Sequence, residues 1–125
     1  MKSPAVDLDL VFSALADETR RRILGLLASG EICVCHIHEA LDVPQPTASR
    51  HLAHLRKAGL VSTRRDGLWV HYRLAEIDDA AINGVLRSAL SALSTNGAAT
   101  TDRKKLSRVI DVPVTTLERA AKSCC

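Results

Sequence analysis

The chain has 125 residues, which favours a single domain, and its 17 Lys and Arg residues against 14 Asp and Glu residues give a net charge of only +3. Apolar residues make up 46% of it, but one Trp, one Tyr and one Phe leave the core to Leu, Ala, Val and Ile, which favours a mainly α fold over a β-sandwich. No apolar run reaches the roughly 18 residues of a membrane span, and residues 1–9 lack the apolar segment of a secretory signal, so we expect a cytoplasmic protein with no membrane contact.

Apolar residues at helical spacing predict several short helices in the first half of the chain. Asp17 is suited to end the first helix and cap the second, and the run Arg20-Arg21-Arg22 is expected on a solvated face. Pro44 makes the stretch before it a turn, whereas Pro46 suits the first turn of a helix that Gly59 ends. The predicted helices cover residues 8–17, 18–30, 33–40 and 46–58.

The helix predicted over 46–58 has two distinct faces. Ala48, Leu52 and Leu55 recur at the spacing of one helix face and should point inward. The opposite face carries a polar stripe made of Thr47, Arg50, His54 and Lys57.

The second half of the chain predicts a β-hairpin and one more firm helix. Strands over 60–65 and 68–74 flank the turn signal Asp66-Gly67. A helix with a wide apolar stripe starts at Asp78-Asp79 and runs to Leu93. Small and polar residues over 94–101 predict a linker. We therefore divide the chain into a domain over 1–93 and a flexible C-terminal tail over 94–125 that carries Cys124 and Cys125.

The order helix, turn, helix and basic hairpin is the plan of a winged helix-turn-helix protein, mainly α with a small β-hairpin. Residues 41–73 hold six basic and two acidic residues, a net charge of +4 that exceeds that of the whole chain. Positive charge on one helix and one hairpin suits contact with DNA phosphates and bases. The alternative is a small helical domain with a solvated basic face. The candidate DNA-binding residues are Gln45, Thr47, Ser49, Arg50, His54, Lys57, Arg64 and Arg65.

Four stretches of the chain resemble the ArsR/SmtB family of metal- and metalloid-responsive repressors, most closely its arsenical-resistance branch. They are Glu31–Cys35, Gln45–Leu52, Leu55–Val61 and Gly67–Leu74. The resemblance spans roughly residues 8–93 and implies a homodimer that binds double-stranded operator DNA. It also implies that the two subunits associate through their first and last core helices and that the dimer leaves DNA when an inducer binds. That inducer is As(III), or Sb(III) or methylarsenite, and no other cofactor is required.

Two positions depart from the pattern of that branch. The third thiol of the branch falls on His38 here, and its small capping residue before the recognition helix is Pro44. The first departure leaves the inducer site with two thiols, those of Cys33 and Cys35.

The cysteines form two close pairs, which in a reducing compartment indicate metal binding or redox chemistry rather than structural disulfides. Trivalent arsenic is soft and binds thiolates, commonly three. On a regular helix, residues i and i+2 point about 200° apart, so binding through both Cys33 and Cys35 must use a frayed helix start or distort the helix. Distortion would then disturb the helix that follows. Cys124 or Cys125 is the candidate third ligand, in the same chain or the partner.

The same residues are also compatible with other functions. His36 and His38 beside the thiols suit zinc or cadmium, and the thiol pair suits a redox-sensing repressor of the same fold. A metal carrier without DNA binding is a further alternative, which the basic stripe disfavours. An enzyme is disfavoured because redox centres usually have Cys-x-x-Cys beside a βαβ unit, and no catalytic set stands out. His51, beside Arg50, is interpreted as a structural histidine.

Overall fold

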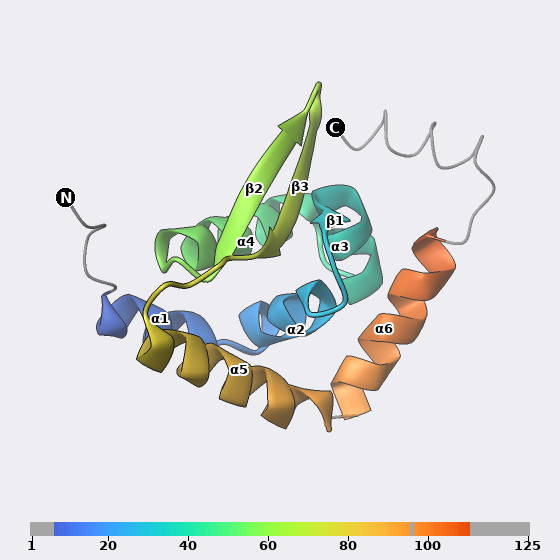
Figure 1. Cartoon of the computed structure of the whole chain (residues 1–125). Helices are drawn as coiled ribbons and strands as arrows, with labels where there is room; N and C mark the ends of the chain where they lie inside the picture. Colours follow the sequence, from blue (N-terminus) through green and yellow to red (C-terminus); the bar gives the residue numbers. More distant parts are fainter. Residues whose placement is uncertain (1–6, 96, 111–125) are drawn as a thin grey trace.

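The computed structural model describes residues 7–95 and 97–110, which form a helical body with a β-hairpin projecting from it (Figure 1). Its elements are α1 (Leu8–Leu15), α2 (Glu18–Leu27), β1 (Ile32–Cys33), α3 (Val34–Leu41), α4 (Gln45–Lys57), β2 (Val61–Asp66), β3 (Trp69–Leu74), α5 (Ala80–Ser94) and α6 (Gly97–Ile110). This order confirms the predicted winged helix-turn-helix architecture.

The helices begin and pack as their sequences predict. Asp17 accepts a hydrogen bond from the backbone N–H of Arg20 at 3.0 Å and so caps α2. Asp79 accepts from the N–H of Ala81 at 2.9 Å and caps α5 in the same way. The predicted inward face of α4 is confirmed, because its three apolar side chains are fully buried: Ala48, Leu52 and Leu55.

The turn between α3 and α4 is made by a residue in an unusual conformation. Asp42 follows α3 with φ of 59°, a left-handed conformation that Asp tolerates better than most residues. The N–H of Val43 donates to the carbonyl of His38 at 3.1 Å, which closes the end of α3. Pro44 stands at the N-cap of α4 without a side-chain cap bond, so backbone geometry alone starts this helix.

The hairpin differs from its prediction by one residue and gains a third strand. Asp66 pairs with Trp69, so the two turn residues are Gly67 and Leu68, and Gly67 has φ of 63°. Glycine at the first central position is what a type II′ hairpin turn requires. β1 pairs antiparallel with β3 and gives the strand order β1-β3-β2. A strand of two residues is too short to leave a periodic pattern in the sequence.

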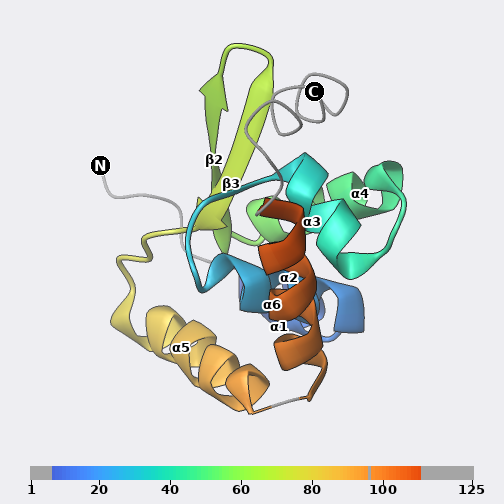
Figure 2. The same ribbon diagram turned by 90° about the vertical axis from the view of Figure 1, so that its right-hand side faces the viewer.

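The expected linker and flexible tail from residue 94 are wrong for residues 97–110, which form α6. This helix packs against α2 and α3 (Figure 2). Leu106 lies in the hydrophobic core at 6% exposure, and Asp102 on the same face is 2% exposed. The sequence signal is weak because α6 buries only two of its side chains, one apolar and one acidic, and the partner of the acidic one is 80 positions away on α2.

The Arg20-Arg21-Arg22 run was expected on a solvated face, and this expectation is wrong. One edge of the Arg22 guanidinium donates to both carboxylate oxygens of Asp102, from Nε at 2.9 Å and from an Nη at 2.8 Å. The same Nη donates to the carbonyl of Leu41 at 3.3 Å, so Arg22 joins α2, the end of α3 and α6. Its two neighbours donate to carbonyls at the end of α1 instead.

Removal of Arg22 and removal of Asp102 should lower the free energy of unfolding by different amounts. Arg22→Met leaves an ionised carboxylate that is 3% exposed and should lower the free energy of unfolding by about 3 kcal/mol. Asp102→Asn leaves a guanidinium that is 24% exposed and partly hydrated, so the loss should be about half as large. Urea unfolding at one fixed protein concentration measures both, and equal losses would contradict the buried-carboxylate explanation.

Candidate nucleic-acid interface and thiol pair

The predicted DNA-binding residues of α4 lie on and beside its solvent-facing side. Arg50 and Lys57 are exposed. The predicted residues nearer the helix start are partly exposed: Gln45, Thr47 and Ser49. A helix that presents two cations and several short polar side chains along one face is suited to lie in the major groove.

The two histidines of α4 face its neighbours. His54 was predicted to belong to the outward stripe, but its Nε2 lies 3.4 Å from the hydroxyl of Ser13 on α1. The Nδ1 of His51 lies 3.2 Å from an Nη of Arg20 and 3.8 Å from the carboxylate of Asp17. These contacts agree with a structural role for His51. Thr47 and His54 are both partly exposed and Arg50 and Lys57 are exposed, so the DNA-binding role predicted for these four residues stays a prediction.

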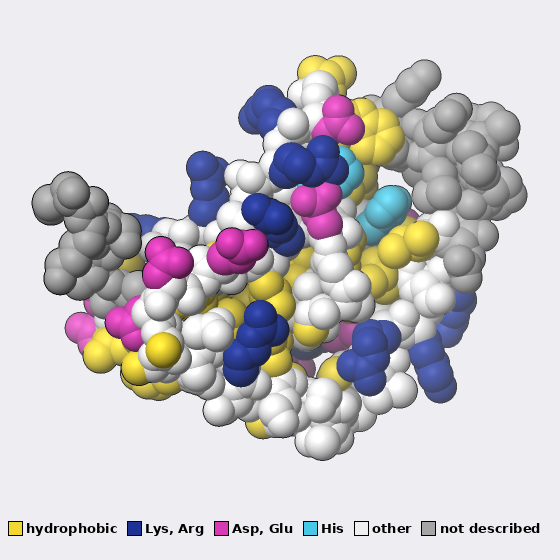
Figure 3. Space-filling model, in the orientation of Figure 1, with side chains coloured by type: hydrophobic (Ala, Val, Ile, Leu, Met, Phe, Trp, Pro, Cys, Tyr) yellow, Lys and Arg dark blue, Asp and Glu magenta, His cyan; other side chains and the backbone are white. Residues whose placement is uncertain are grey.

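The wing carries the two remaining predicted DNA contacts, and they differ in their surroundings. Basic side chains gather along the wing with acidic ones among them (Figure 3). Arg65 is exposed. Arg64 binds Glu31, which directly precedes β1, with nitrogen–oxygen distances of 2.6 and 3.0 Å. The Arg64 guanidinium lowers the pKa of the Glu31 carboxyl, so the pair is charged at neutral pH.

Cys33 and Cys35 bring their sulfurs together at the start of α3. The two Sγ atoms are 2.9 Å apart, and the residues are 3% and 2% exposed. Cys33 is the last residue of β1 and the N-cap of α3, with extended φ and ψ of −72° and 146°. The opposed directions expected of i and i+2 apply only where both residues are helical. The helix start thus brings both sulfurs to one point, and binding of a ligand there stays a prediction.

The thiol pair is directly connected to the wing. Cys33 pairs with His71 and Ile32 pairs with Tyr72, so the residues around the first thiol form part of the same sheet as the wing strands. Glu31 adds its ion pair to β2. The sequence does not reveal this link, because β1 is only two residues long.

The histidines near the thiols do not complete a metal site. Burial lowers the pKa of His36, and its Nε2 is enclosed without a hydrogen-bond partner in the described ranges. The Nδ1 of His38 lies 3.3 Å from the carbonyl of Val43, at the other end of α3. No three His, Cys, Asp or Glu residues between 7 and 110, residue 96 aside, are placed to hold one ion. Cys124 and Cys125 lie outside the described residues.

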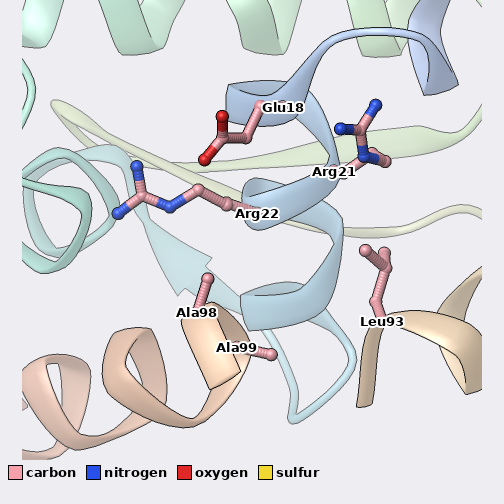
Figure 4. A pocket seen from close by; sticks show the side chains of 6 residues that line it. All are labelled: Glu18, Arg21, Arg22, Leu93, Ala98 and Ala99. Atoms are coloured by element: carbon pink, nitrogen blue, oxygen red, sulfur yellow. The ribbon is translucent and has the colours of Figure 1, made fainter. Parts of the chain in front are cut away.

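A small cavity lies elsewhere, between α2, α5 and α6. It measures about 140 Å³ and is lined by Glu18, Arg21, Arg22, Leu93, Ala98 and Ala99 (Figure 4). Arg21 and Arg22 point to opposite sides of α2 in this view, and their guanidinium groups are bonded to the carbonyl of Leu15 and to Asp102. The cavity is a packing space beside these contacts, and it holds none of the predicted site residues.

Comparison with known proteins supports the architecture and shows the family. The family model "Bacterial regulatory protein, arsR family" matches residues 17–63. The arsenic resistance transcriptional regulator ArsR1 of Pseudomonas putida is 50% identical over 62% of this chain and 64% of its own length. The arsenical resistance operon repressor of Escherichia coli is 56% identical over 52% of this chain and 56% of its own. The chain thus spans less than two thirds of these two relatives.

Longer matches and solved structures agree. ArsR2 of Pseudomonas putida is 47% identical over 67% of this chain and 74% of its own. HlyU from Vibrio cholerae superposes with a TM-score of 0.60 at 30% identity, over 71% of this chain and 92% of that one. The homodimeric winged helix-turn-helix DNA-binding domain Mb0332 from Mycobacterium bovis gives a TM-score of 0.60 at 29% identity, over 78% and 94% of the two chains. The chain belongs to the arsR family of bacterial regulatory proteins. None of the helices described between residues 7 and 110 is long and apolar enough to cross a membrane.

The ion pair between Glu31 and Arg64 should be measurable as a low pKa of the carboxyl. Because Arg64 stabilises the charged form, Arg64→Met should raise the pKa of Glu31 toward the ordinary value of about 4.3. NMR titration of the side-chain carboxyl carbons measures it. Arg65→Met, which removes a neighbouring cation of the same strand, is the matched control and should leave this pKa unchanged. A Glu31 pKa that stays low in Arg64→Met would contradict the assignment.

Proposed function

We propose that the protein is a transcriptional repressor that binds double-stranded operator DNA as a homodimer and releases it when trivalent arsenic binds Cys33 and Cys35. The observation that carries the proposal is the pair of buried sulfurs 2.9 Å apart at the junction of β1 and α3. Relatives named for arsenic resistance support it.

The DNA-binding part of the proposal rests on α4 and the wing. Arg50 and Lys57 on α4 would reach into the major groove, with Thr47, Gln45 and Ser49 close to the helix start. Arg65, and Arg64 with its partner Glu31, would meet the backbone beside it. Phosphate contacts of this kind make binding strongly dependent on salt.

The homodimer would form through α1 and α5, on the side of the helical body away from the wing tip (Figure 1). Leu8 and Phe12 on α1 are 51% and 55% exposed, an unusual display of large apolar side chains on a small domain. Val85 and Leu90 on α5 are only partly buried against the core. A second copy would cover these side chains and give a symmetric dimer with two recognition helices. Mb0332, the structural neighbour described above, is homodimeric.

The proposed release depends on a difference between the free and the arsenic-bound thiols. A ligand shifts DNA binding only if it favours one of two conformations. Bridging both sulfurs would fix the end of β1 and the first turn of α3 together. β1 transmits that constraint to β3 of the wing, and α3 transmits it to α4 through the turn at Asp42.

The third ligand of As(III) is proposed to be Cys124 or Cys125. α6 packs on α3 and ends at Ile110, and the 14 residues from there to Cys124 can extend over about 46 Å. Methylarsenite has only two exchangeable positions, so Cys33 and Cys35 would suffice for it. Sb(III) would use the same sulfurs.

A redox-responsive repressor of the same fold is the second candidate, and the same sulfur distance favours it. Two thiols this close can form a disulfide when a peroxide accepts two electrons and two protons and leaves as water and an alcohol or a second water. Zinc or cadmium is less well supported, because the described residues supply two ligands to one point rather than four.

The proposal is tested with labelled DNA from the region upstream of the chain's own gene, by fluorescence anisotropy. Wild type should bind, and arsenite should lower its affinity about ten-fold or more. Cys35→Ser should bind DNA equally well but stay bound in arsenite, because one sulfur is lost from the pair. Absence of DNA binding by wild type, or arsenite release of Cys35→Ser, would contradict the proposal.

The tail is tested by Cys124→Ser/Cys125→Ser in the same assay. This variant should need more arsenite than wild type for release, yet respond normally to methylarsenite. An unchanged arsenite response would remove the tail cysteines from the site. Hydrogen peroxide in place of arsenite distinguishes the redox-responsive repressor from the arsenic-responsive one. Release of DNA by peroxide but not by arsenite would favour the redox-responsive repressor.

A further inference from the structure

A set of polar side chains joins α1 and the start of α2 to the recognition helix α4. We call it the α1–α4 seam; its members are Ser13, Asp17, Arg20, His51 and His54. The chain separation between its bonded residues is 31 and 41 positions, so the seam is tertiary rather than local. None of these residues belongs to the proposed dimer face or to the thiol pair.

Arg20 is the centre of the seam. Its Nε donates to the carbonyl of Ala14 at 3.1 Å and one Nη donates to that of Ser13 at 2.9 Å, so it caps the end of α1. Its other Nη lies 3.2 Å from the Nδ1 of His51 on α4. A guanidinium only donates hydrogen bonds, so Nδ1 is the acceptor and the imidazole carries its proton on Nε2.

The other members of the seam lie beside the contact between Arg20 and His51. Asp17 accepts from the backbone N–H of Arg20 and lies 3.8 Å from His51 Nδ1. Ser13 and His54 make a second link one helical turn further along α4. Two links a turn apart fix the rotation of α4 about its own axis as well as its distance from α1.

The helices on either side of the seam have different proposed tasks. α1 carries the exposed Leu8 and Phe12 of the proposed dimer face, and α4 carries Arg50 and Lys57 of the proposed DNA face. A dimer reads two half-sites about 34 Å apart, so the angle between α1 and α4 decides whether both recognition helices fit at once. Buried apolar contacts from Val11 and Ala14 hold the helices together but are not directional.

We propose that Arg20 and His51 are positioning residues that set the orientation of the recognition helix relative to the dimer face. They act through the placement of α4, without contact to DNA. The inference rests on the proposed function for its effect on operator binding. Its structural part, the fixed angle between α1 and α4, stands independently of what the protein binds.

The first test compares His51→Leu with His51→Asn. Leu cannot accept from Arg20, whereas the Asn side-chain oxygen takes the place of Nδ1 and can. His51→Leu should lose about ten-fold in operator affinity with unchanged affinity for unrelated DNA, and His51→Asn should recover most of that loss. Equal loss on both DNAs, no loss, or failure of Asn to restore binding would each overturn the proposal.

Arg20→Met and Arg21→Met provide the matched pair for the guanidinium. Both remove one cation from α2 and its bonding to carbonyls at the end of α1, two bonds for Arg20 and one for Arg21, but of the two only Arg20 reaches α4. Arg20→Met should lose operator affinity and Arg21→Met should not, at similar thermal stability. Equal losses would assign the effect to capping of α1 and overturn the proposal.

A distance measurement without DNA separates this inference from the proposed function. A spin label at Ala53→Cys, on the exposed side of α4, reports the distance between the two recognition helices in the dimer. In the labelled protein Cys124 and Cys125 are replaced by Ser, whereas the buried Cys33 and Cys35 are kept. Pulsed electron resonance should give a narrow distribution for the parent, a broad one for His51→Leu and a narrow one for His51→Asn. Identical distributions would overturn the inference even if operator binding is confirmed, and the expected pattern would uphold it even if the chain bound no operator.

Discussion

The junction of β1 and α3 is the constraint on which the rest of the site depends. Cys33 ends a strand and caps a helix, and its extended backbone turns its sulfur toward that of Cys35. Had both residues been helical, their side chains would point about 200° apart. The same short strand pairs with β3, so one local backbone feature both forms the thiol pair and connects it to the wing.

Around that junction, arginines organise the helical body. Arg22 ties α6 and the end of α3 to α2, Arg21 binds the end of α1, and Arg20 binds α1 and reaches α4. Each donates to a carbonyl at a helix end, where the last carbonyls have no partner within the helix, and Arg22 also binds the buried carboxylate of Asp102 within α6. Three consecutive residues of one helix therefore hold the neighbours on which the proposed sensing, dimer and DNA-binding faces lie.

Much of this fold is readable from the sequence because local signals decide it. Asp17 and Asp79 mark helix starts, and Pro44 indicates the turn before the recognition helix. Gly67 predicts the position of the wing turn to within one residue. What the sequence does not reveal depends on distant partners. α6 is held by contacts of Arg22 and Leu106 that exist only once the body has formed, and β1 is too short for a pattern. The contact of His54 with Ser13 on α1 joins residues 41 positions apart. The thiol pair is predictable as a pair, but its link to the wing is not.

We propose that the thiol pair communicates with the wing through β1, which contains Cys33 and pairs with β3. The most direct test is hydrogen exchange of the backbone amides of β1 and β3, followed by NMR with and without arsenite and in the absence of DNA. Exchange at the paired residues Ile32, Cys33, His71 and Tyr72 should change when arsenic binds, and Cys35→Ser should abolish the change. Arsenic binding that alters only α3 and α4, with β3 unaffected, would contradict this proposal.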